Sequence, residues 1–599
     1  MDHPTPFRRV VFCFFSTLVF LLMLAVLELN HNTLLSFALA SLAALIFWLL
    51  YHKWTRRKKW FVKGLFWLVW IGVFIVIVKF TWPPTKAVPA VAGKDPQHTD
   101  VRTTAYGDVQ GVLTTDGKVE VYAGIPYATP PVGDLRWTEP KDPEPWEGTL
   151  QADHFAPMSM QPTHIPLYDS LVQIIGYHDY KISLDDNWVP PVSEDSLYLN
   201  IWKPEGDVKD CPVLVFIHGG SLQTGQTWYH DYSGESLARE GVIVVNFAYR
   251  LGVFGYLADA ELIEESPNGT TGNYGLLDQI QALKWVQENI ASFGGDPDQV
   301  TIAGESAGAA SVSALCVSPL AKGLFQRAIL ESSTVASPEP PHSFRSMEEA
   351  QASGARMKLR LVVSTMYELR RMPAEELLEW VDTEHHMTID GYALTELPMT
   401  SYQNGRFNET AILHGYNSRE SASFLLFDRV GRKEYEKRVR NYFGDHADQV
   451  LALYPASTDE EAAANWAMIW GAVFFDYPHY CLNRLAVEQG IPVYEYYFTK
   501  ENGRIGPWHS GEMIYCYGNI PEKSALYDDR DRELSEEMLD YWANFIKTGD
   551  PNGEGLPEWK QNTASEDLMQ FGETTAMGKE QEHELFAIMD ALYDVNGKE

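Results

Sequence analysis

The chain has 599 residues, of which 45% are hydrophobic, so it is long enough to bury a large core. Its formal net charge of −34 disfavours a nucleic acid partner, because phosphate backbones would be repelled. The cysteines are too few and too scattered for a disulfide framework or a zinc site. We therefore expect buried thiols at Cys13, Cys211, Cys316, Cys481 and Cys516.

Three apolar runs predict a membrane anchor over residues 1 to 82, with transmembrane helices at about 10 to 29, 34 to 51 and 61 to 80. The first two runs each contain 18 consecutive uncharged residues, which is just enough to cross a bilayer. The only charged residues in the third run are Lys63 and Lys79, and each lies near an end where its ammonium can reach the interface. A cleaved signal peptide fits poorly, because the first run lacks a small-residue cleavage site and two more runs follow it.

Basic residues predict the orientation of this anchor. Arg8 and Arg9 precede the first run, the loop 28 to 33 has no Lys or Arg, and residues 53 to 63 contain six basic residues and no acidic one. This places the amino terminus inside and the chain after residue 82 outside. Alternatively, the third run lies in the interface and leaves the rest of the chain in the cytoplasm. The Pro- and Ala-rich residues 83 to 100 are typical of a flexible linker.

Residues 101 to 599 have the pattern of one large α/β domain. Helical periodicity over residues 275 to 294 alternates with buried-strand runs, which predicts a mostly parallel sheet with helices on both faces. The predicted strands are 213 to 218, 242 to 249, 300 to 304 and 493 to 499. The charged stretch 340 to 410 is predicted to be a helical insertion over the edge of the sheet.

The sequence VTIAGESAGAASV, at residues 300 to 312, combines a short strand, a Gly-x-Ser-x-Gly turn and a small-residue helix start. Gly304 and Gly308 allow a tight strand-to-helix turn that presents the hydroxyl of Ser306 at its tip. Ser306 is therefore the candidate nucleophile. The pentapeptide alone is a weak signal, because a Gly-rich helix entry is often only a turn.

Upstream, a predicted strand ends in the sequence HGGS at residues 218 to 221. Backbone N–H groups in such a loop can stabilise the negative oxygen of a tetrahedral intermediate. The alternative is an ordinary pair of glycines between a strand and a loop. The position of this loop before the nucleophile turn agrees with the chain order of an acyl-transfer enzyme.

These motifs and several further blocks closely resemble the type-B carboxylesterase family, the α/β-hydrolases that include cholinesterases and bacterial esterases, over about residues 101 to 590. The resemblance implies an α/β-hydrolase fold, an active site at the bottom of a gorge, and no cofactor or metal. The further blocks are GIPYATPPVGDLRW (124 to 137), SEDSLYLNIW (193 to 202), YRLGVFGYL (249 to 257), GNYGLLDQIQALKWVQENIASFGGDPDQ (272 to 299) and GLFQRAI (323 to 329).

The resemblance implies an oxyanion hole formed by the amides of Gly220, Ser221 and Ala307, although the family usually has Gly or Ala at the position of Ser221. It also implies that Glu420 is the acid of the catalytic triad. Glu420 lies in GYNSRES (415 to 421), which matches the family's Gly-x-Asn-x-x-Glu-Gly except that Ser421 replaces the last Gly. A carboxylate is needed there to fix the tautomer of the imidazole.

His509 is the implied base, in GPWHSGEMIYCYG (506 to 518), where Ser510 replaces the Gly of the family's His-Gly-x-Glu pattern. The order Ser306, Glu420, His509 is that of the α/β-hydrolases. Because the base must be neutral, we expect kcat/KM to fall in acid with an apparent pKa between about 5 and 8.

Other family positions concern the scaffold. Many animal members have a disulfide where this chain has Ser159 and Ser196. Its absence suits a bacterial surface protein, although a cytosolic catalytic domain would look the same. Two charged pairs used structurally by the family map onto Arg136 with Glu194 and onto Arg250 with Asp278.

The sequence therefore predicts a membrane-anchored serine carboxylesterase that acts on a small-molecule ester. The alternative is a non-catalytic cell-surface adhesion protein of the same family, which would not need Ser306, Glu420, His509 and the oxyanion glycines together. The stretches 162 to 192 and 340 to 410 are expected to shape the substrate pockets. Neither the physiological ester nor the oligomeric state follows from the sequence.

Overall fold

A computed structural model gives the structure of the chain, which divides into two compact units. The first contains residues 1 to 87 and 163 to 191, and the second contains residues 88 to 162 and 192 to 599. The structure describes residues 6–54, 58–93, 95–162, 166–167, 170–171, 189–339, 344–379, 386–501, 506–524, 526–563 and 567–595.

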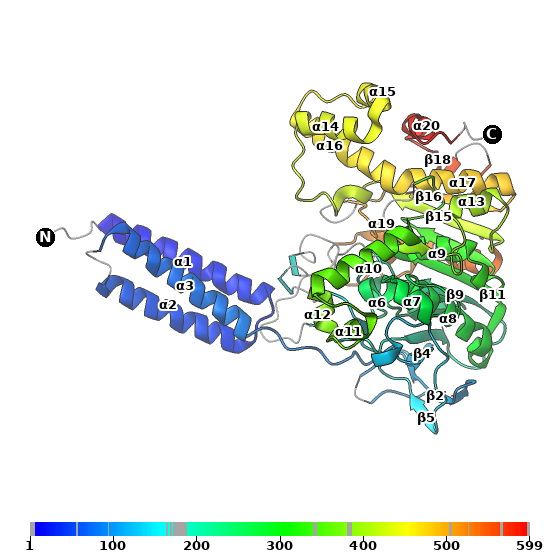
Figure 1. Cartoon of the computed structure of the whole chain (residues 1–599), viewed down its shortest axis with the longest axis horizontal. Coiled ribbons are helices and arrows are strands. Elements are labelled where there is room, and N and C mark those ends of the chain that lie inside the picture. Colours follow the sequence, from blue (N-terminus) through cyan, green and yellow to red (C-terminus); the bar gives the residue numbers. More distant parts are fainter. Residues whose placement is uncertain are drawn as a thin grey trace. The chain divides into compact units, whose positions relative to one another are not determined.

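The first unit contains three long helices, drawn in blue in Figure 1: α1 (Pro6–Leu29), α2 (Leu34–Trp54) and α3 (Trp60–Phe80). Each is long and apolar enough to cross a membrane, over Val10–Leu29, Leu34–Tyr51 and Trp60–Phe80. At most 22% of the residues in any of these stretches are buried inside the protein, so most of their apolar side chains face outward. Such a surface is suited to contact with lipid.

The turn between α1 and α2 joins other parts of the first unit through polar contacts. The Nδ2 atom of Asn32 donates to the carbonyl oxygens of Val78 (2.9 Å) and Thr81 (2.7 Å), which satisfies acceptors at the end of α3. His31 Nε2 lies 3.0 Å from Ser170 Oγ, within the stretch predicted to shape a substrate pocket. Part of that stretch thus packs in the same unit as α1, α2 and α3.

The second unit is built on an 11-stranded sheet with the order β18-β17-β16-β15-β12-β11-β9-β10-β8-β4-β3. The pairs from β17 to β10 are parallel, and those towards the two edges are antiparallel. The predicted strands correspond to β9, β10, β11 and β16. The strands are β3 (Val112–Leu113), β4 (Val119–Pro126), β8 (Tyr198–Pro204), β9 (Cys211–Ile217), β10 (Ile243–Phe247), β11 (Gly295–Glu305), β12 (Arg327–Glu331), β15 (Ala411–Asn417), β16 (Val493–Phe498), β17 (Asp567–Phe571) and β18 (Thr575–Lys579).

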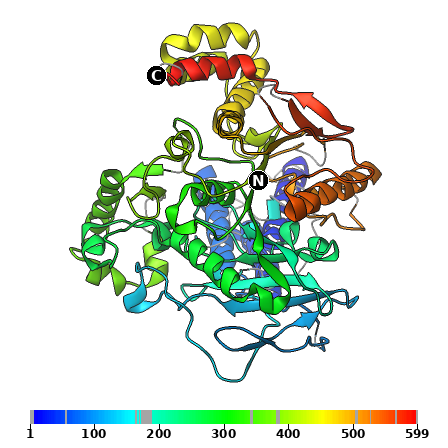
Figure 2. The same cartoon turned by 90° about the vertical axis from the view of Figure 1, so that its right-hand side faces the viewer.

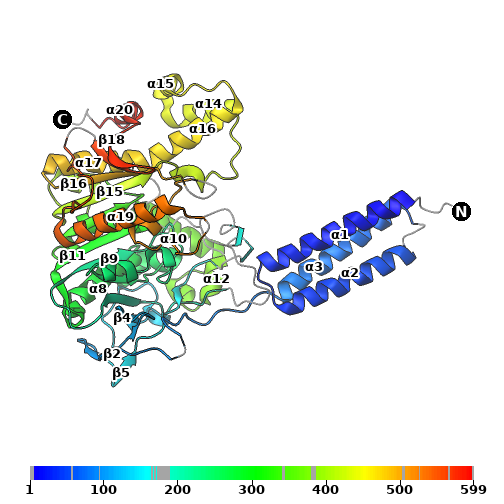
Figure 3. The same cartoon turned by 180° about the vertical axis from the view of Figure 1, so that it is seen from behind.

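Helices cover both faces of this sheet, as the sequence predicts. Helices α8 (Tyr274–Asn289) and α9 (Ala307–Val317) lie on the face seen in Figure 1, and α19 (Asp529–Thr548) lies on the face seen in Figure 3. Because both faces are covered, the central strands are mostly apolar, and all five residues of β10, including Asn246, are buried. The sheet and its helices form the main core.

Short strands lie outside the large sheet, and backbone hydrogen bonds hold the start of the second unit against it. The Val91 N–H donates to Asp153 O (2.9 Å) and the Thr99 N–H to Gly111 O (3.1 Å). Residues 88 to 100, which composition placed in a flexible linker, therefore belong to the second unit. The short strands are β1 (Arg102–Thr103), β2 (Asp108–Gln110), β5 (Thr149–Gln151), β6 (Met158–Ser159), β7 (Val192–Ser193), β13 (Phe344–Ser346) and β14 (Met387–Ile389).

The insertion predicted over 340 to 410 is mostly helical in its described parts, apart from the short strands β13 and β14, but its predicted place at the sheet edge was wrong. Met357 and Met366 pack against Phe254 and Leu262 of helices α6 and α7, whereas the edge strands are β3 and β18. The insertion buries its apolar side chains on a helical layer, which charge and periodicity alone do not specify. The helices concerned are α6 (Gly252–Tyr256), α7 (Ala260–Glu265), α10 (Met347–Leu361), α11 (Met366–Arg370), α12 (Ala374–Glu379) and α13 (Pro398–Gln403).

A second helical cluster lies near the carboxyl terminus. Figure 2 shows α20 beside the helices that precede α17, and Tyr435 and Val439 share a core with Leu585 and Phe586. A π-helical turn (Ala472–Asp476) joins α16 directly to α17. The helices are α14 (Arg432–Phe443), α15 (Ala447–Leu453), α16 (Asp459–Gly471), α17 (Tyr477–Gln489) and α20 (His583–Leu592).

Candidate active site

Ser306 occupies a strained turn between β11 and α9. Its backbone has φ of +56° and ψ of −124°, a conformation rare for a residue with a side chain. A Cβ atom on Gly304 would lie 2.5 Å from the Gly308 carbonyl carbon, and one on Gly308 would lie 2.0 Å from Ile217 O. Both positions therefore require glycine, and the turn leaves the partly exposed Ser306 at its tip.

The structure brings Ser306, His509 and Glu420 together from three distant parts of the chain. Ser306 Oγ lies 2.8 Å from His509 Nε2, and His509 Nδ1 lies 2.7 Å from Glu420 Oε2. The other carboxylate oxygen of Glu420 accepts the Asn417 N–H at 2.8 Å. With Nδ1–H donating to Glu420, Nε2 is the nitrogen left to accept the hydroxyl proton of Ser306.

The segments that carry Glu420 and His509 follow neighbouring parallel strands, β15 and β16. The carboxyl ends of such strands share one edge of the sheet, where active sites commonly lie. Arg419 pairs with Trp508 in a parallel bridge, and the Arg419 N–H donates to Pro507 O at 3.1 Å. Asn417 Nδ2 also donates to Trp508 O at 2.8 Å. Backbone contacts thus hold the acid and the base in register.

The predicted oxyanion loop lies beside Ser306. A Cβ atom on Gly219 would lie 3.0 Å from the Ser306 Cβ, so the loop runs directly past the nucleophile. Among the described residues, no group accepts the N–H groups of Gly220, Ser221 or Ala307. Three such unpaired donors next to a serine hydroxyl are suited to binding a developing oxyanion.

Gln161 fastens this loop from the other side. Its Nε2 donates to Gly225 O at 2.8 Å, and its Oε1 accepts the Gly225 N–H at 3.0 Å. A side chain at position 225 would collide with His218, because a Cβ atom there would lie 2.1 Å from its Nδ1. The loop therefore has little freedom to move its N–H groups.

Two more buried carboxylates, which were not among the predicted site residues, face His509. Glu305 Oε1 lies 3.3 Å from His509 Nε2, and Glu512 accepts hydrogen bonds from Ser332 (2.8 Å) and Tyr496 (3.1 Å). Their positions inside the Gly-x-Ser-x-Gly and His-Ser-Gly-Glu motifs were the available signal.

These carboxylates change the proton affinities of the site. Burial raises the pKa of Glu305, and it raises the pKa of Glu512 to about 7. Burial acts to lower the pKa of His509, but the negative charges of Glu305, Glu420 and Glu512 outweigh it and raise that pKa to about 9. The site thus favours the imidazolium form that a general base must pass through.

Aromatic rings form an apolar wall beside His509. The centres of the Phe424 and Phe475 rings lie 5.0 Å and 4.8 Å from the centre of the imidazole. Trp470 contacts Phe424, with ring centres 5.3 Å apart. No sequence motif predicts this wall, because Phe475 reaches the site from a π-helical turn, which has no recognisable pattern.

The predicted scaffold pairs are formed. Arg136 makes a two-pronged ion pair with Glu194 (2.6 and 2.5 Å), and Arg250 makes one with Asp278 (2.8 and 2.7 Å). Arg136 Nη1 also donates to backbone oxygens of the 340 to 410 insertion at Leu369, Arg370 and Met372. Both guanidinium groups thus bind carboxylate and carbonyl oxygens of other segments and join those segments together.

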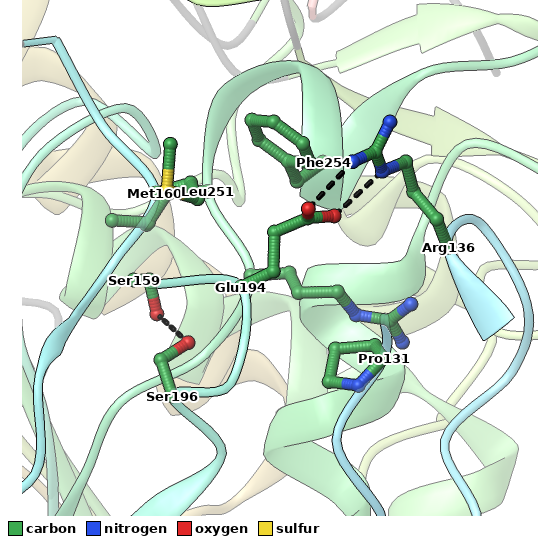
Figure 4. Close-up of a pocket in the computed structure, with 9 residues that line it drawn as sticks. Pro131, Arg136, Ser159, Met160, Glu194, Ser196, Leu251 and Phe254 are labelled. Atoms are coloured by element: carbon green, nitrogen blue, oxygen red, sulfur yellow. Dashed lines mark hydrogen bonds and ion pairs between the residues drawn. The ribbon is translucent and has the colours of Figure 1, made fainter. Parts of the chain in front are cut away.

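A small cavity of about 10 Å³ lies in this region, and Figure 4 shows the side chains that line it. The hydroxyl groups of Ser159 and Ser196 line it and lie 2.9 Å apart.

All five cysteines are free: Cys316, Cys481 and Cys516 are buried as expected, but Cys211 is half-buried and Cys13 is exposed on α1. In the described parts of the chain, no group of three or more His, Cys, Asp or Glu side chains could hold a metal ion.

Comparison with known proteins gives one consistent result. A sequence model described as "Carboxylesterase family" matches residues 98–588. Fumonisin B1 esterase of Sphingopyxis macrogoltabida is 34% identical over 82% of this chain and 90% of its own length. Carboxylesterase 1C of Rattus norvegicus is 32% identical over 84% of this chain and 95% of its own length.

A solved structure agrees with the sequence relatives. The crystal structure of carboxylesterase EST55 of Geobacillus stearothermophilus has a TM-score of 0.69 and 32% identity, and the match covers 82% of this chain and all of that one. The predicted α/β-hydrolase fold is thereby confirmed. The chain belongs to the carboxylesterase family and is an enzyme of the carboxylic-ester hydrolase class.

Proposed function

We propose that the chain hydrolyses carboxylic esters through an acyl-enzyme on Ser306, with His509 as base and Glu420 as its acidic partner. The observation that carries this proposal is the pair of hydrogen bonds from Ser306 Oγ to His509 Nε2 (2.8 Å) and from His509 Nδ1 to Glu420 Oε2 (2.7 Å). This arrangement can take a proton from the hydroxyl and stabilise the imidazolium that results.

In the first half of the reaction, Ser306 Oγ attacks the carbonyl carbon of the ester while Nε2 of His509 takes its proton. The carbonyl oxygen becomes negative and accepts hydrogen bonds from the N–H groups of Gly220, Ser221 and Ala307. The bond from carbon to the alcohol oxygen then breaks, and Nε2–H gives its proton to the leaving alcohol.

In the second half, a water molecule attacks the acyl carbon while His509 takes its proton. The acyl bond to Ser306 Oγ breaks, the serine recovers its proton from Nε2, and the carboxylic acid leaves. Side chains, backbone N–H groups and water account for every proton and electron pair, so the proposal includes no metal or cofactor.

The test is labelling with a fluorophosphonate and turnover of p-nitrophenyl acetate. We expect one label per chain, on Ser306, and loss of roughly four or more decades of kcat in Ser306→Ala. Ser457→Ala is the matched control, because Ser457 is exposed and outside the site. Label on another serine, or full turnover by Ser306→Ala, would overturn the assignment.

We also propose that the substrates are short-chain aryl or alkyl esters. A separate proposal is that α1, α2 and α3 anchor the enzyme in a lipid bilayer. The apolar wall of Phe424 and Phe475 supports an uncharged group next to His509. A series of p-nitrophenyl esters with rising acyl length tests the first statement: the highest kcat/KM is expected at short chains, and a maximum at long chains would contradict it.

A further inference from the structure

Ser510 follows His509 directly and has a backbone conformation that favours glycine. Its φ is +70°, in the left-handed region, which is strained for a residue with a side chain. Its hydroxyl donates a hydrogen bond of 2.5 Å to Glu305 Oε1. The chain thus keeps a strained serine at a position where glycine would fit without strain, and the hydroxyl has one specific acceptor.

That acceptor competes for the catalytic base. Glu305 Oε1 lies 3.3 Å from His509 Nε2, and the same nitrogen lies 2.8 Å from Ser306 Oγ. Once Nε2 has taken the proton of Ser306, it can donate either towards the leaving alcohol or towards Glu305. A carboxylate oxygen without another donor would hold the Nε2–H strongly, since charged hydrogen bonds are about twice as strong as neutral ones.

We propose that Ser510 is a positioning residue that engages Glu305 Oε1 and so keeps Nε2 of His509 directed at Ser306. This inference rests on the proposed function of the triad and deepens it. The Ser510 hydroxyl donates a hydrogen bond to Glu305 Oε1, the oxygen nearest to Nε2. This hydrogen bond weakens the attraction of that oxygen for the imidazolium but leaves the carboxylate in place.

Three carboxylates face His509, and only one of them contacts Ser510. Glu420 approaches Nδ1 from the turn after β15, and Glu512 lies at the start of α18 (Met513–Cys516), bound to other side chains. The rings of Phe424 and Phe475 are uncharged. Removing the Ser510 hydroxyl should therefore leave the contacts of Glu420 and Glu512 unchanged. It should strengthen the attraction between Glu305 and the protonated His509.

The experiment compares Ser510→Ala with Ser510→Gly by the pH dependence of kcat/KM. Both variants lose the hydroxyl, so both should move the acid limb to higher pH by about half a unit or more. Both should also lower kcat at neutral pH by about threefold to tenfold, with KM nearly unchanged. Only Ser510→Gly relieves the backbone strain, so only that variant should gain thermal stability.

Two controls separate this role from a structural one. Val362→Gly relieves the same kind of strain at an exposed helix end (φ of +57°) and should leave the pH profile unchanged. In a Glu305→Gln background, adding Ser510→Ala should not move the acid limb. Phosphonate labelling of Ser306 counts the folded, competent sites in every variant, so incomplete folding does not affect the comparison.

An acid limb that stays in place or moves to lower pH in both Ser510 variants overturns the inference. So does a shift that persists in the Glu305→Gln background. These results differ from failure of the proposed function, which would appear as absence of the label on Ser306 in the unsubstituted protein.

Discussion

The hydroxyl oxygens of Ser159 and Ser196 lie 2.9 Å apart, at the positions where many animal carboxylesterases have a disulfide. Strands β6 and β7 hold the two segments together, since Met158 pairs with Val192 and Ser159 with Ser193, three residues before Ser196. A hydrogen bond thus closes the loop that a covalent bond closes in those relatives. The two side chains therefore point towards one another, as the two sulfur atoms of a disulfide would.

We expect the double variant Ser159→Cys/Ser196→Cys to form a disulfide under oxidising conditions. In the chain-entropy account, closing the loop between residues 159 and 196 should raise the free energy of unfolding by about 3–4 kcal/mol. Urea unfolding in detergent, with and without dithiothreitol, measures the difference. Ser159→Cys alone is the control, and equal stability in both redox states would show that no strain-free cross-link forms.

The acid limb of activity should lie higher than the sequence suggests. The carboxylates around His509 raise its pKa from 6.5 to about 9. Since the base must be neutral, kcat/KM is highest above that pKa and is lost as the pH falls through it. We therefore expect an apparent pKa above 6.5 and towards 9. A profile of kcat/KM from pH 4 to 10 measures it, and full activity down to pH 4 would rule out His509 as base.

His414 and His479 should make the fold sensitive to acid. Their Nδ1 atoms lie 2.9 Å apart, and burial lowers the pKa of His414 to about 3 and that of His479 well below 6.5. Below about pH 6.5 the unfolded chain takes up protons that the folded chain does not. Stability should then fall by up to ~1.4 kcal/mol per pH unit for each histidine.

The variant His479→Gln tests this, because it removes one of the two titrating groups. The dependence of unfolding free energy on pH between 6.5 and 4.5 should become shallower, as measured by urea unfolding at several pH values. His583→Gln, at an exposed position, should leave the slope unchanged. Identical slopes in His479→Gln and the parent would contradict the expectation.

The basic residues near α3 predict which side of the membrane the catalytic unit faces. The six basic residues between Lys53 and Lys63 should stay in the cytoplasm, so α3 crosses outward and the catalytic unit faces the outside. Protease added to intact cells should cut in the segment after residue 82 and release a fragment that still carries phosphonate label at Ser306. Protection of that fragment until the membrane is permeabilised would show that α3 does not deliver it outward.

Much of the catalytic arrangement could be predicted because its motifs are local. The elbow at Ser306 needs glycines at fixed spacing, and the resemblance to the family's motifs around Glu420 and His509 indicates the other two residues, in an agreeing chain order. The same holds for the central strands, whose continuous apolar runs show that both of their faces are covered.

The rest depends on contacts between distant segments. Periodicity indicates that 340 to 410 is helical, but the layer that receives it is set by apolar side chains such as Phe254, which look like any other core residue. Phe475 reaches the imidazole only because of one π-helical turn. Glu305 and Glu420 lie beside His509 because β11, β15 and β16 belong to one sheet and end at the same edge, which the sequence alone does not specify.

The contact between His31 and Ser170 has a practical consequence. Deleting the first 87 residues would give a more soluble protein with Ser306, Glu420 and His509 intact, but it would strip Ser170 of the helical turn it packs against. Substrate preference measured on such a fragment would describe a truncated enzyme. Kinetic work on this protein therefore calls for the full chain in detergent or a lipid nanodisc.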